Sequence, residues 1–302
     1  MHIPDGVLSL PVWASLDAVA LPAVGYVARQ AGRNMEEKGI PLLGVMGAFV
    51  FAAQMINFPV GAGTSGHLVG SALLAITLGP AAAALVMTAI LMTQALIFQD
   101  GGVLALGANV MNMALAGVAV GFLPYHYWGG GAWRRASIFL GGAFSVLASA
   151  SLALLQLTIS GVPMGAHVVG VSIGLFIVNA LLEGAITLAV AEGIESINPV
   201  WLRKPSARTG KLAGVFAASA ILLAAVGVLF ASASPDGLAR LLAQSGIAGH
   251  TRNFIQAPFS DYQIRYFESP WMRKPAAALA GLAAIYAVCF AVSRILRRPR
   301  SA

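Results

Sequence analysis

Long apolar stretches alternate with short polar connectors along almost the whole chain. An apolar stretch of about 20 residues lets a helix cross the hydrocarbon core of a bilayer. The pattern predicts nine membrane spans, seven followed by two, at about residues 11–28, 41–56, 68–78, 81–98, 103–123, 137–158, 167–190, 212–231 and 275–295. A polar connector at residues 192–211 separates the seven from the two, which predicts one domain over residues 1–200 and a second over residues 201–302.

Composition narrows the class of protein. Hydrophobic residues make up 58% of the 302 residues, charged residues only 10%, and the mean hydropathy is +0.82. These values indicate an all-α polytopic membrane protein. We expect a seven-helix bundle followed by a two-helix hairpin around an exposed extracytoplasmic loop at residues 232–274. The single cysteine, Cys289, lies in an apolar run, which excludes a disulfide framework and a thiolate metal cluster.

The distribution of basic residues predicts the orientation of the chain. If the N-terminus faces outward, thirteen Lys and Arg residues fall on the inner side, and five fall in the loop at residues 232–274. The short outward connectors hold none, and short loops decide orientation. We therefore expect the N-terminus outside and the C-terminus in the cytoplasm, in a bacterial inner or plasma membrane. The net charge of +7 then reflects topology, so we expect membrane lipid and no nucleic acid as a partner.

The most specific chemistry lies in the N-terminal hook, residues 1–6. The chain begins Met1-His2-Ile3-Pro4-Asp5-Gly6. The α-amine of Met1 and the backbone nitrogen of His2 would close a five-membered ring around a metal ion, and that nitrogen and the imidazole would close a six-membered ring. Fused rings favour a planar arrangement, which suits Ni(II) or Cu(II) better than Co(II). We expect Met1 to be retained, with no leader removed, because the bulky His2 disfavours methionine removal.

A second histidine is expected to supply the fourth ligand. His67 ends a segment, residues 61–67, that is too rich in glycine to be a good helix. We expect this segment to be a loop folded into the bundle that carries His67 inward. The predicted metal ligands are Met1, His2 and His67, and the residues predicted to support them through hydrogen bonds are Thr64, Ser65, Asn57 and Asn109.

Each of these residues has an ordinary alternative. A histidine at position 2 is commonly an accident of a frayed terminus, and His67 alone could be a core or interface histidine. Thr64 and Ser65 could instead cap the following helix. The two asparagines could form interhelical hydrogen bonds.

Three further histidines and one acid have weaker interpretations. His126 lies beside aromatic residues, where an interfacial aromatic belt is expected. His167 could line an access route, and His250, in the exposed loop, could gather metal. Glu183 is expected to face a cavity or a partner, because an intramembrane carboxylate is costly to bury.

The sequence lacks two motifs of catalysis. Gly210-Lys211 is followed by Leu212 without the upstream glycine of a phosphate-binding loop, and no His-Glu-x-x-His motif occurs. The chain is therefore not expected to hydrolyse ATP through such a loop or to be an intramembrane zinc protease. Two other interpretations of the histidines stay open. A membrane enzyme would need a carboxylate such as Asp5 beside the histidines, and a metal sensor would bind without transport.

Several motifs then occur together in order. They are Met1-His2-Ile3-Pro4-Asp5-Gly6, Gln54-Met55-Ile56-Asn57-Phe58-Pro59, Gly63-Thr64-Ser65-Gly66-His67, Phe98-Gln99-Asp100-Gly101-Gly102 and Leu106-Gly107-Ala108-Asn109. Through them, residues 1–200 resemble the substrate-binding membrane component of nickel/cobalt energy-coupling-factor transporters, the NikM/CbiM family. The resemblance implies seven helices and a planar metal site formed by the N-terminal amine, His2 and His67. It also implies that the chain is a transport subunit and not an enzyme, without a cofactor of its own. The implied partners are a transmembrane coupling subunit and two cytoplasmic ATPases, on which ATP is hydrolysed.

The C-terminal part carries a second resemblance. With Ser234-Pro235-Asp236-Gly237-Leu238 between two helices, it is similar to the accessory subunit of the same systems, NikN or CbiN, fused to the first domain. It departs from that family at Ala239, where an acidic residue is usual. The segment Ser65-Gly66-His67-Leu68 resembles the nickel branch rather than the Ser-His-Pro version of the cobalt branch. The sequence thus predicts a capture subunit for Ni(II), with Co(II) uptake for cobalamin synthesis as the alternative.

Overall fold

The computed structural model shows a chain folded mostly into helices, which confirms the all-α class. It describes residues 1–34, 40–61, 63–198, 202, 210–232, 234–247, 249, 251 and 253–296. His250 lies outside the described residues, as do eight basic residues used to predict orientation: Lys38, Arg203, Lys204, Arg208, Arg252, Arg297, Arg298 and Arg300.

The helices follow the predicted spans with some changes at their ends. The long ones are α1 (Leu10–Asn34), α2 (Ile40–Gln54), α4 (Pro80–Thr93), α6 (Val118–Trp128), α7 (Arg134–Ile159), α8 (Ala166–Ile197), α9 (Gly210–Ala225) and α11 (Pro270–Leu296). The short ones are α3 (Ser71–Leu78), α5 (Leu106–Asn109) and α10 (Gly237–Gln244). A π-helical segment, Gln94–Phe98, extends α4, and another, Val110–Gly117, joins α5 to α6. Short 3-10 helices lie at Gly227–Phe230 and Ser260–Tyr262.

The lengths of these helices identify a multi-pass membrane protein. Six helices in the described ranges are long and apolar enough to cross a bilayer: Leu10–Arg33, Pro80–Phe98, Leu106–Trp128, Arg134–Ile159, Ala166–Ile197 and Trp271–Leu296. Two shorter apolar helices, Pro41–Gln54 and Ala213–Ala225, fall in the predicted second and eighth spans. The predicted third span contains only α3, whose eight residues extend about 12 Å. The number of crossings stays a prediction.

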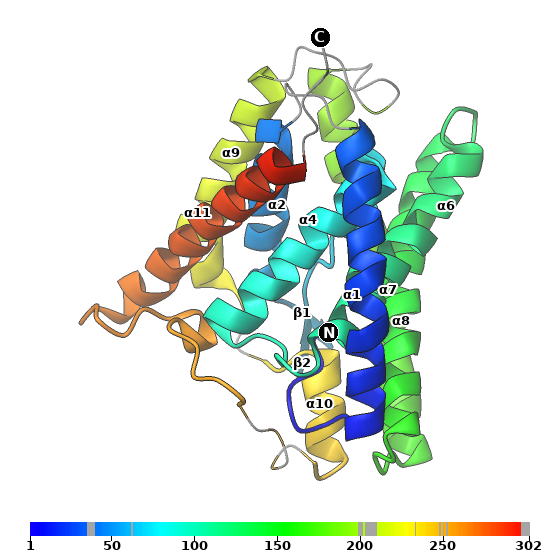
Figure 1. Ribbon diagram of the computed structural model, residues 1–302, viewed down its shortest axis with the longest axis vertical. Helices are drawn as coiled ribbons and strands as arrows, with labels where there is room; N and C mark the ends of the chain where they lie inside the picture. The colour runs from blue at the N-terminus through cyan, green and yellow to red at the C-terminus, as the bar shows by residue number, and fades with distance from the viewer. Residues whose placement is uncertain are drawn as a thin grey trace.

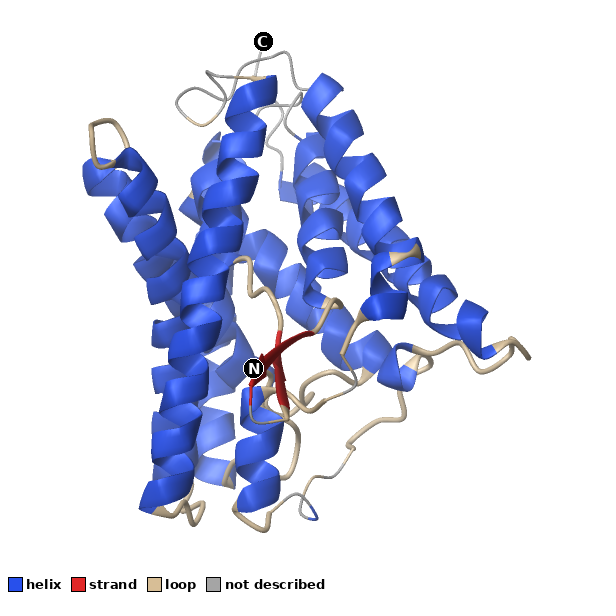
Figure 2. Ribbon diagram, turned by 180° about the vertical axis from the view of Figure 1, so that it is seen from behind, coloured by secondary structure: helices blue, strands red, loops and turns tan. Residues whose placement is uncertain are grey.

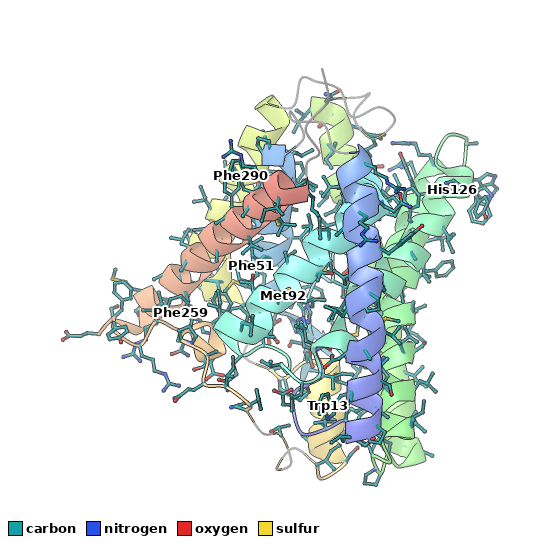
Figure 3. All side chains as sticks on the ribbon, viewed as in Figure 1. Trp13, Phe51, Met92, His126, Phe259 and Phe290 are labelled. Atoms are coloured by element: carbon teal, nitrogen blue, oxygen red, sulfur yellow. The ribbon has the colours of Figure 1, made fainter. Side chains whose placement is uncertain are left out.

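The helices form two groups with α1 and α4 between them (Figure 1). On one side α7 packs along α8 and α6 packs on α7. On the other side α2, α9 and α11 pack against one another, so the two long helices of the predicted second domain rest on a helix of the first. The side chains of Phe51 and Phe98 are buried against each other, and Figure 3 shows Phe51 near the centre. Gly281 lets α11 approach, because a Cβ there would lie 2.4 Å from the ring of Phe51.

A small β-hairpin leads the chain to His67. Strand β1 (Phe58–Gly61) pairs antiparallel with β2 (Thr64–Gly66), and both lie inside the bundle beside the N-terminus (Figure 2). All three residues of β2 are buried. The backbone at Gly66 passes so close to α8 that a Cβ would lie 2.1 Å from the Asn179 Oδ1. The segment expected to be an irregular loop is therefore partly a strand, and it does fold into the bundle.

Candidate metal site

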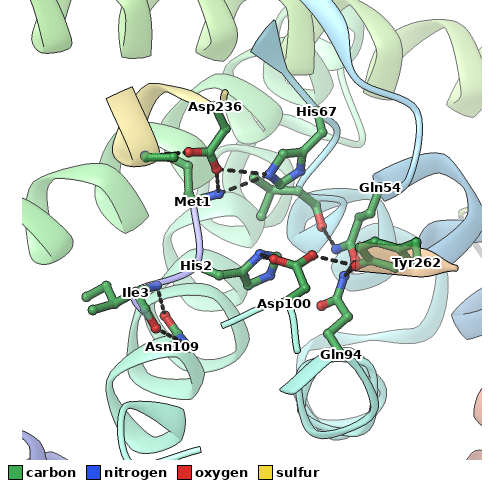
Figure 4. Close-up of polar contacts among 12 residues, drawn as sticks. Met1, His2, Ile3, Gln54, His67, Gln94, Asp100, Asn109, Asp236 and Tyr262 are labelled. Carbon is green, nitrogen blue, oxygen red and sulfur yellow. Dashed lines mark hydrogen bonds and ion pairs between the residues drawn. The ribbon is translucent and has the colours of Figure 1, made fainter. Parts of the chain in front are cut away.

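The N-terminus lies inside the molecule rather than in solvent. Met1 is 6% exposed and Ile3 is fully buried. Asn109 binds both backbone groups of Ile3, because its Oδ1 accepts from the Ile3 nitrogen at 2.8 Å and its Nδ2 donates to the Ile3 oxygen at 3.0 Å. The Gly102 nitrogen also donates to the Ile3 oxygen, at 2.9 Å. Asn109 therefore orients the segment that carries the predicted ligands (Figure 4).

Two aspartates tie the N-terminal part of the chain to α5 and to the turn before it. The carboxylate of Asp5 accepts hydrogen bonds from the backbone nitrogens of Val103 and Leu104, at 3.0 and 2.8 Å. Asp17, an unusual residue within the first span, accepts from the Gly107 nitrogen at 2.6 Å. A side chain at position 107 would collide with this carboxylate, since a Cβ would lie 2.2 Å from its Oδ1. These contacts explain why charged residues occur here and give Asp5 the role of an anchor.

The amine of Met1 meets His67 and a carboxylate from the predicted second domain. Its nitrogen lies 2.9 Å from the His67 Nε2 and 2.6 Å from the Asp236 Oδ2 (Figure 4). The structure thus brings together two of the predicted ligands, which are 66 residues apart in the sequence. It adds Asp236, which sequence reasoning did not place at the site.

The ring of His67 is held so that its outer nitrogen faces the amine. Its Nδ1 lies 2.9 Å from the backbone oxygen of Leu68, which can only accept, so Nδ1 carries the proton and Nε2 keeps its lone pair. Burial lowers the pKa of His67, and the positive charge of the amine lowers it further. The neutral imidazole is therefore the favoured form, and this is the form that binds metals.

The ring of His2 lies parallel to that of His67, with ring centroids 5.8 Å apart and 4° between the planes. Its Nδ1 lies 3.0 Å from the Asp100 Oδ1, while its buried Nε2 has no hydrogen-bond partner among the described residues. Asp100 also accepts a short hydrogen bond from the hydroxyl of Tyr262. Burial opposes ionisation of Asp100, but the charge and hydrogen bond of His2 and the bond from Tyr262 keep its pKa well below the ordinary value.

This position of the His2 ring differs from the predicted chelate. A six-membered ring with the backbone nitrogen uses Nδ1, and Nδ1 is the atom that contacts Asp100. The described conformation is therefore not the chelating one. Turning the ring about its Cβ–Cγ bond would release Nδ1 from the carboxylate.

Asp236 reaches the site from the start of α10. Its Oδ1 accepts from the Ala239 nitrogen at 2.7 Å and caps the helix, while its Oδ2 contacts the amine and lies 3.7 Å from the His67 Nε2. Burial raises its pKa, but the positive amine and the contact with His67 outweigh burial and hold the pKa well below the usual value. An Asp-Gly pair before a helix is a recognisable capping signal, yet nothing local in the sequence indicates a partner 235 positions away.

The residues predicted to support His67 from its own segment bind residues of the predicted second domain instead. Thr64 Oγ1 accepts from the Arg240 Nη1 at 2.8 Å, and Ser65 Oγ donates to the Ser234 oxygen at 2.7 Å. Neither bond reaches the ring of His67. The helix after this segment, α3, begins at Ser71 and has no side-chain cap in the described part of the chain, so neither residue caps it. The backbone oxygen of Asn57 accepts from the Ser232 nitrogen at 2.8 Å.

A cavity of about 460 Å³ opens in front of these groups. His2, His67, Asp100 and Asp236 line it, and so do Thr251, Asp261 and Tyr262 of the loop between α10 and α11. Asn57 also lines the cavity. The loop that the sequence describes only as exposed therefore forms part of the wall of the site.

The remaining candidates lie elsewhere or have structural roles. His126 is exposed at the end of α6 that is far from the hook, between the rings of Phe122 and Tyr127 (Figure 3). His167 is exposed in the first turn of α8. Glu183 accepts from the backbone nitrogens of Val69 and Gly70 at 2.7 and 2.8 Å, and so fixes the chain just after His67.

The donor set at the site depends on the backbone as well as on side chains. Within the described ranges, no group of three or more His, Cys, Asp or Glu side chains is arranged to hold a metal ion. A metal site at this position would therefore need the terminal amine and a backbone nitrogen as donors besides the imidazoles.

Comparisons with known proteins point to one family. Residues 2–201 match the family model described as the cobalt uptake substrate-specific transmembrane region, and residues 210–298 match the PDGLE domain. The chain is 34% identical over 312 residues to an Archaeoglobus fulgidus protein whose name describes a fused nickel transport protein, NikMN, with 98% of this chain and 99% of that one covered. It is 35% identical over 206 residues to the cobalt transport protein CbiM of Thermosediminibacter oceani, with 65% and 81% covered. The crystal structure of a truncated transition metal transporter matches 65% of this chain and 99% of its own, with a TM-score of 0.57 and 32% identity.

Proposed function

This chain belongs to the family of cobalt uptake substrate-specific transmembrane proteins, joined to a PDGLE domain, and on that premise we propose that it captures Ni(II) for an ATP-driven importer. As a transport protein of this family it is not an enzyme, and the names of its relatives support uptake of nickel or cobalt. The finer statements concern the metal, its ligands and the partner subunits.

One distance carries the proposal. Two donors on adjacent corners of a square around one ion, each bonded at about 2.0–2.1 Å, lie about 2.9 Å apart. The Met1 nitrogen and the His67 Nε2 are separated by 2.9 Å. An ion bound by both would need little movement of either group.

The other two donors come from His2. The metal takes the place of a proton on its backbone nitrogen, and the ring turns so that Nδ1 leaves Asp100 and completes the six-membered ring. His67 then lies opposite the backbone nitrogen of His2. Four nitrogens in a plane suit Ni(II), because this geometry is typical of Ni(II) and Cu(II). Co(II) uptake remains the second candidate, supported by the cobalt-transport name of one relative.

Transport also needs partners and an orientation. We infer that the site faces outward, and that a transmembrane coupling subunit and cytoplasmic ATPases drive release of the ion to the inside. The N-terminus then lies outside and the C-terminus in the cytoplasm, as the positive-inside rule predicts. A sensor without transport is the less favoured alternative, because the relatives described above are named for transport.

The test is a metal titration of the full chain without a tag, followed by the visible absorption of planar Ni(II). We expect one equivalent of Ni(II) to bind more tightly than Co(II). A retained Gly-Ser-Gly extension before Met1 should abolish binding, because it removes the amine from its place. The extension has three residues because a single added residue would put the histidine third and create a new chelating terminus.

The same three residues added after Ala302 are the matched control and should leave binding unchanged. Undiminished nickel binding by the N-terminally extended protein would contradict the proposed ligands. Tighter binding of Co(II) than of Ni(II) would contradict the proposed metal but not the site.

A further inference from the structure

We propose that Asp236 of the second domain is a positioning residue of the metal site, which holds the Met1 amine beside His67 before the metal arrives. The inference rests on the proposed function, since it assigns a residue to the same site. It makes the second domain part of the site rather than a neighbour of it.

The Asp236 carboxylate contacts the amine and is itself held in a fixed position. Its two oxygens have different partners: Oδ1 caps α10 through the Ala239 nitrogen, and Oδ2 lies 2.6 Å from the amine. A capping carboxylate is restrained by the helix it caps. Oδ2 is therefore presented at one position, and the amine must come to that position to pair with it.

Backbone and side-chain bonds fasten this part of the chain to the strand before His67. The Ser65 nitrogen donates to the Pro235 oxygen at 2.9 Å, and the Ser65 hydroxyl donates to the Ser234 oxygen at 2.7 Å. Arg240, one turn into α10, donates to Thr64 at 2.8 Å. Any movement of residues 234–240 would therefore also move the strand that ends at His67.

Apolar contacts fasten the same helix to the hook. Leu238, Leu241 and Leu242 of α10 are 0–3% exposed and share one hydrophobic cluster with Ile3. Gly237 lies against α8, where a Cβ would be 3.0 Å from the ring of Phe176. The hook, the His67 segment and α10 are thus packed as one unit, with Asp236 at the point where the three meet.

The contact with the amine also suits the loaded site. A metal-bound amine keeps two N–H groups, so it can still donate to the Asp236 Oδ2. A dipositive ion that has displaced a proton from the His2 backbone nitrogen leaves one positive charge, and the carboxylate offsets it. Offsetting charge in this way matters because an uncompensated charge is costly to bury.

The experiment compares substitutions that keep α10 capped. Asp236→Asn keeps the shape and the cap but removes the charge, and Asp236→Ser keeps the cap but is too short to reach the amine. Glu268→Gln is the matched control, because Glu268 is an exposed carboxylate of the loop between α10 and α11 and is not among the residues that line the cavity. Stopped-flow mixing of the full chain with Ni(II) gives association and dissociation rates, and the visible band gives the ligand geometry.

We expect both Asp236 variants to bind Ni(II) at least tenfold more slowly than the unaltered protein, with the same visible band at saturation. The band also shows that the variant is folded. Glu268→Gln should bind within twofold of the unaltered rate. Association of Asp236→Asn within twofold of the unaltered rate, or a slowing matched by Glu268→Gln, would overturn the inference.

Other outcomes are equally decisive. A changed band in Asp236→Asn would show that the carboxylate binds the metal itself, and would replace positioning by ligation. Failure of the unaltered protein to bind Ni(II) would overturn the proposed function and this inference together. Normal binding by the unaltered protein with an unaffected Asp236→Asn would overturn this inference alone.

Discussion

Two polar clusters at opposite ends of the bundle look alike and differ in what they can do. At the hook, an amine, two imidazoles and two carboxylates meet around Met1. At the other end, Arg134 donates to the hydroxyl of Tyr125 at 3.1 Å and to the Gly129 oxygen at 2.7 Å, and it forms a short ion pair with Glu195. Both clusters join segments that are distant in the sequence, and both lie largely out of solvent.

The difference lies in the lone pairs. Arg134 keeps its charge and has no acceptor atom, so it can connect α6, α7 and α8 but offers no lone pair to a cation. Its positive charge is paired with the Glu195 carboxylate. The Met1 amine and the imidazoles of His2 and His67 become donors to a metal when they lose or lack a proton. Residue type, and not burial, therefore distinguishes a metal site from a structural ion pair here. Four experiments test this distinction.

The largest effect is expected at the fourth proposed ligand. His67→Ala removes one donor and should weaken Ni(II) binding by at least about 100-fold. Arg134→Gln disrupts the other cluster and should leave the Kd within twofold. Both are measured by titration of purified protein. Retained tight binding in His67→Ala would move the fourth ligand elsewhere.

Acid should weaken metal binding through the hook rather than through His67. Binding displaces protons from the amine and the backbone nitrogen, so affinity falls as pH falls, by at least about tenfold per pH unit. The pKa of His67 is lowered by burial and by the nearby amine, so its protonation would contribute only below the ordinary imidazole range. Titrations between about pH 8 and pH 6 check the slope. A flat affinity over this range would contradict the displacement of protons.

A smaller effect is expected from the residue that orients the hook. Asn109→Ala removes both hydrogen bonds to Ile3 and should weaken Ni(II) binding by about tenfold. Asn112→Ala is the matched control, because Asn112 pairs with Gln156 at 2.9 and 2.7 Å. Equal losses of affinity in the two variants would mean that general destabilisation, not orientation of the hook, is responsible.

The smallest effect belongs to the other cluster. Glu195→Gln removes the charge that faces Arg134 and should lower the free energy of unfolding by about 1 kcal/mol, because the pair is only partly buried. Thermal unfolding in detergent measures it, and the Kd for Ni(II) should not change. A shift in Kd without a change in stability would show that the two ends of the bundle are coupled.

Much of the fold could be predicted because hydrophobic runs are a local property of the sequence. The runs give the membrane class and most helices. They do not show that residues 68–78 contain only a short helix, since an apolar run inside a bundle looks the same as the start of a crossing helix. Nor do they reveal the pairing of β1 with β2, which depends on a turn between short strands.

The candidate site could be predicted in part for the same reason. The chelating pattern at Met1 and His2 is contained in two adjacent residues, and His67 stands out in its glycine-rich segment; their role as ligands stays a prediction. Asp100 and Asp236 were missed as members of the site. Their partners lie 98 or more positions away, and such distances are set only by tertiary packing.

Fusion of the two domains has a consequence for how the site is completed. Because Asp236 belongs to the same polypeptide as Met1, its local concentration at the amine is fixed by the tether and not by how much of a second protein the cell makes. Cutting the chain between α8 and α9 would turn an intramolecular contact into a bimolecular one. Rapid metal capture would then depend on the concentration of the separate C-terminal piece, a dependence that the intact chain avoids.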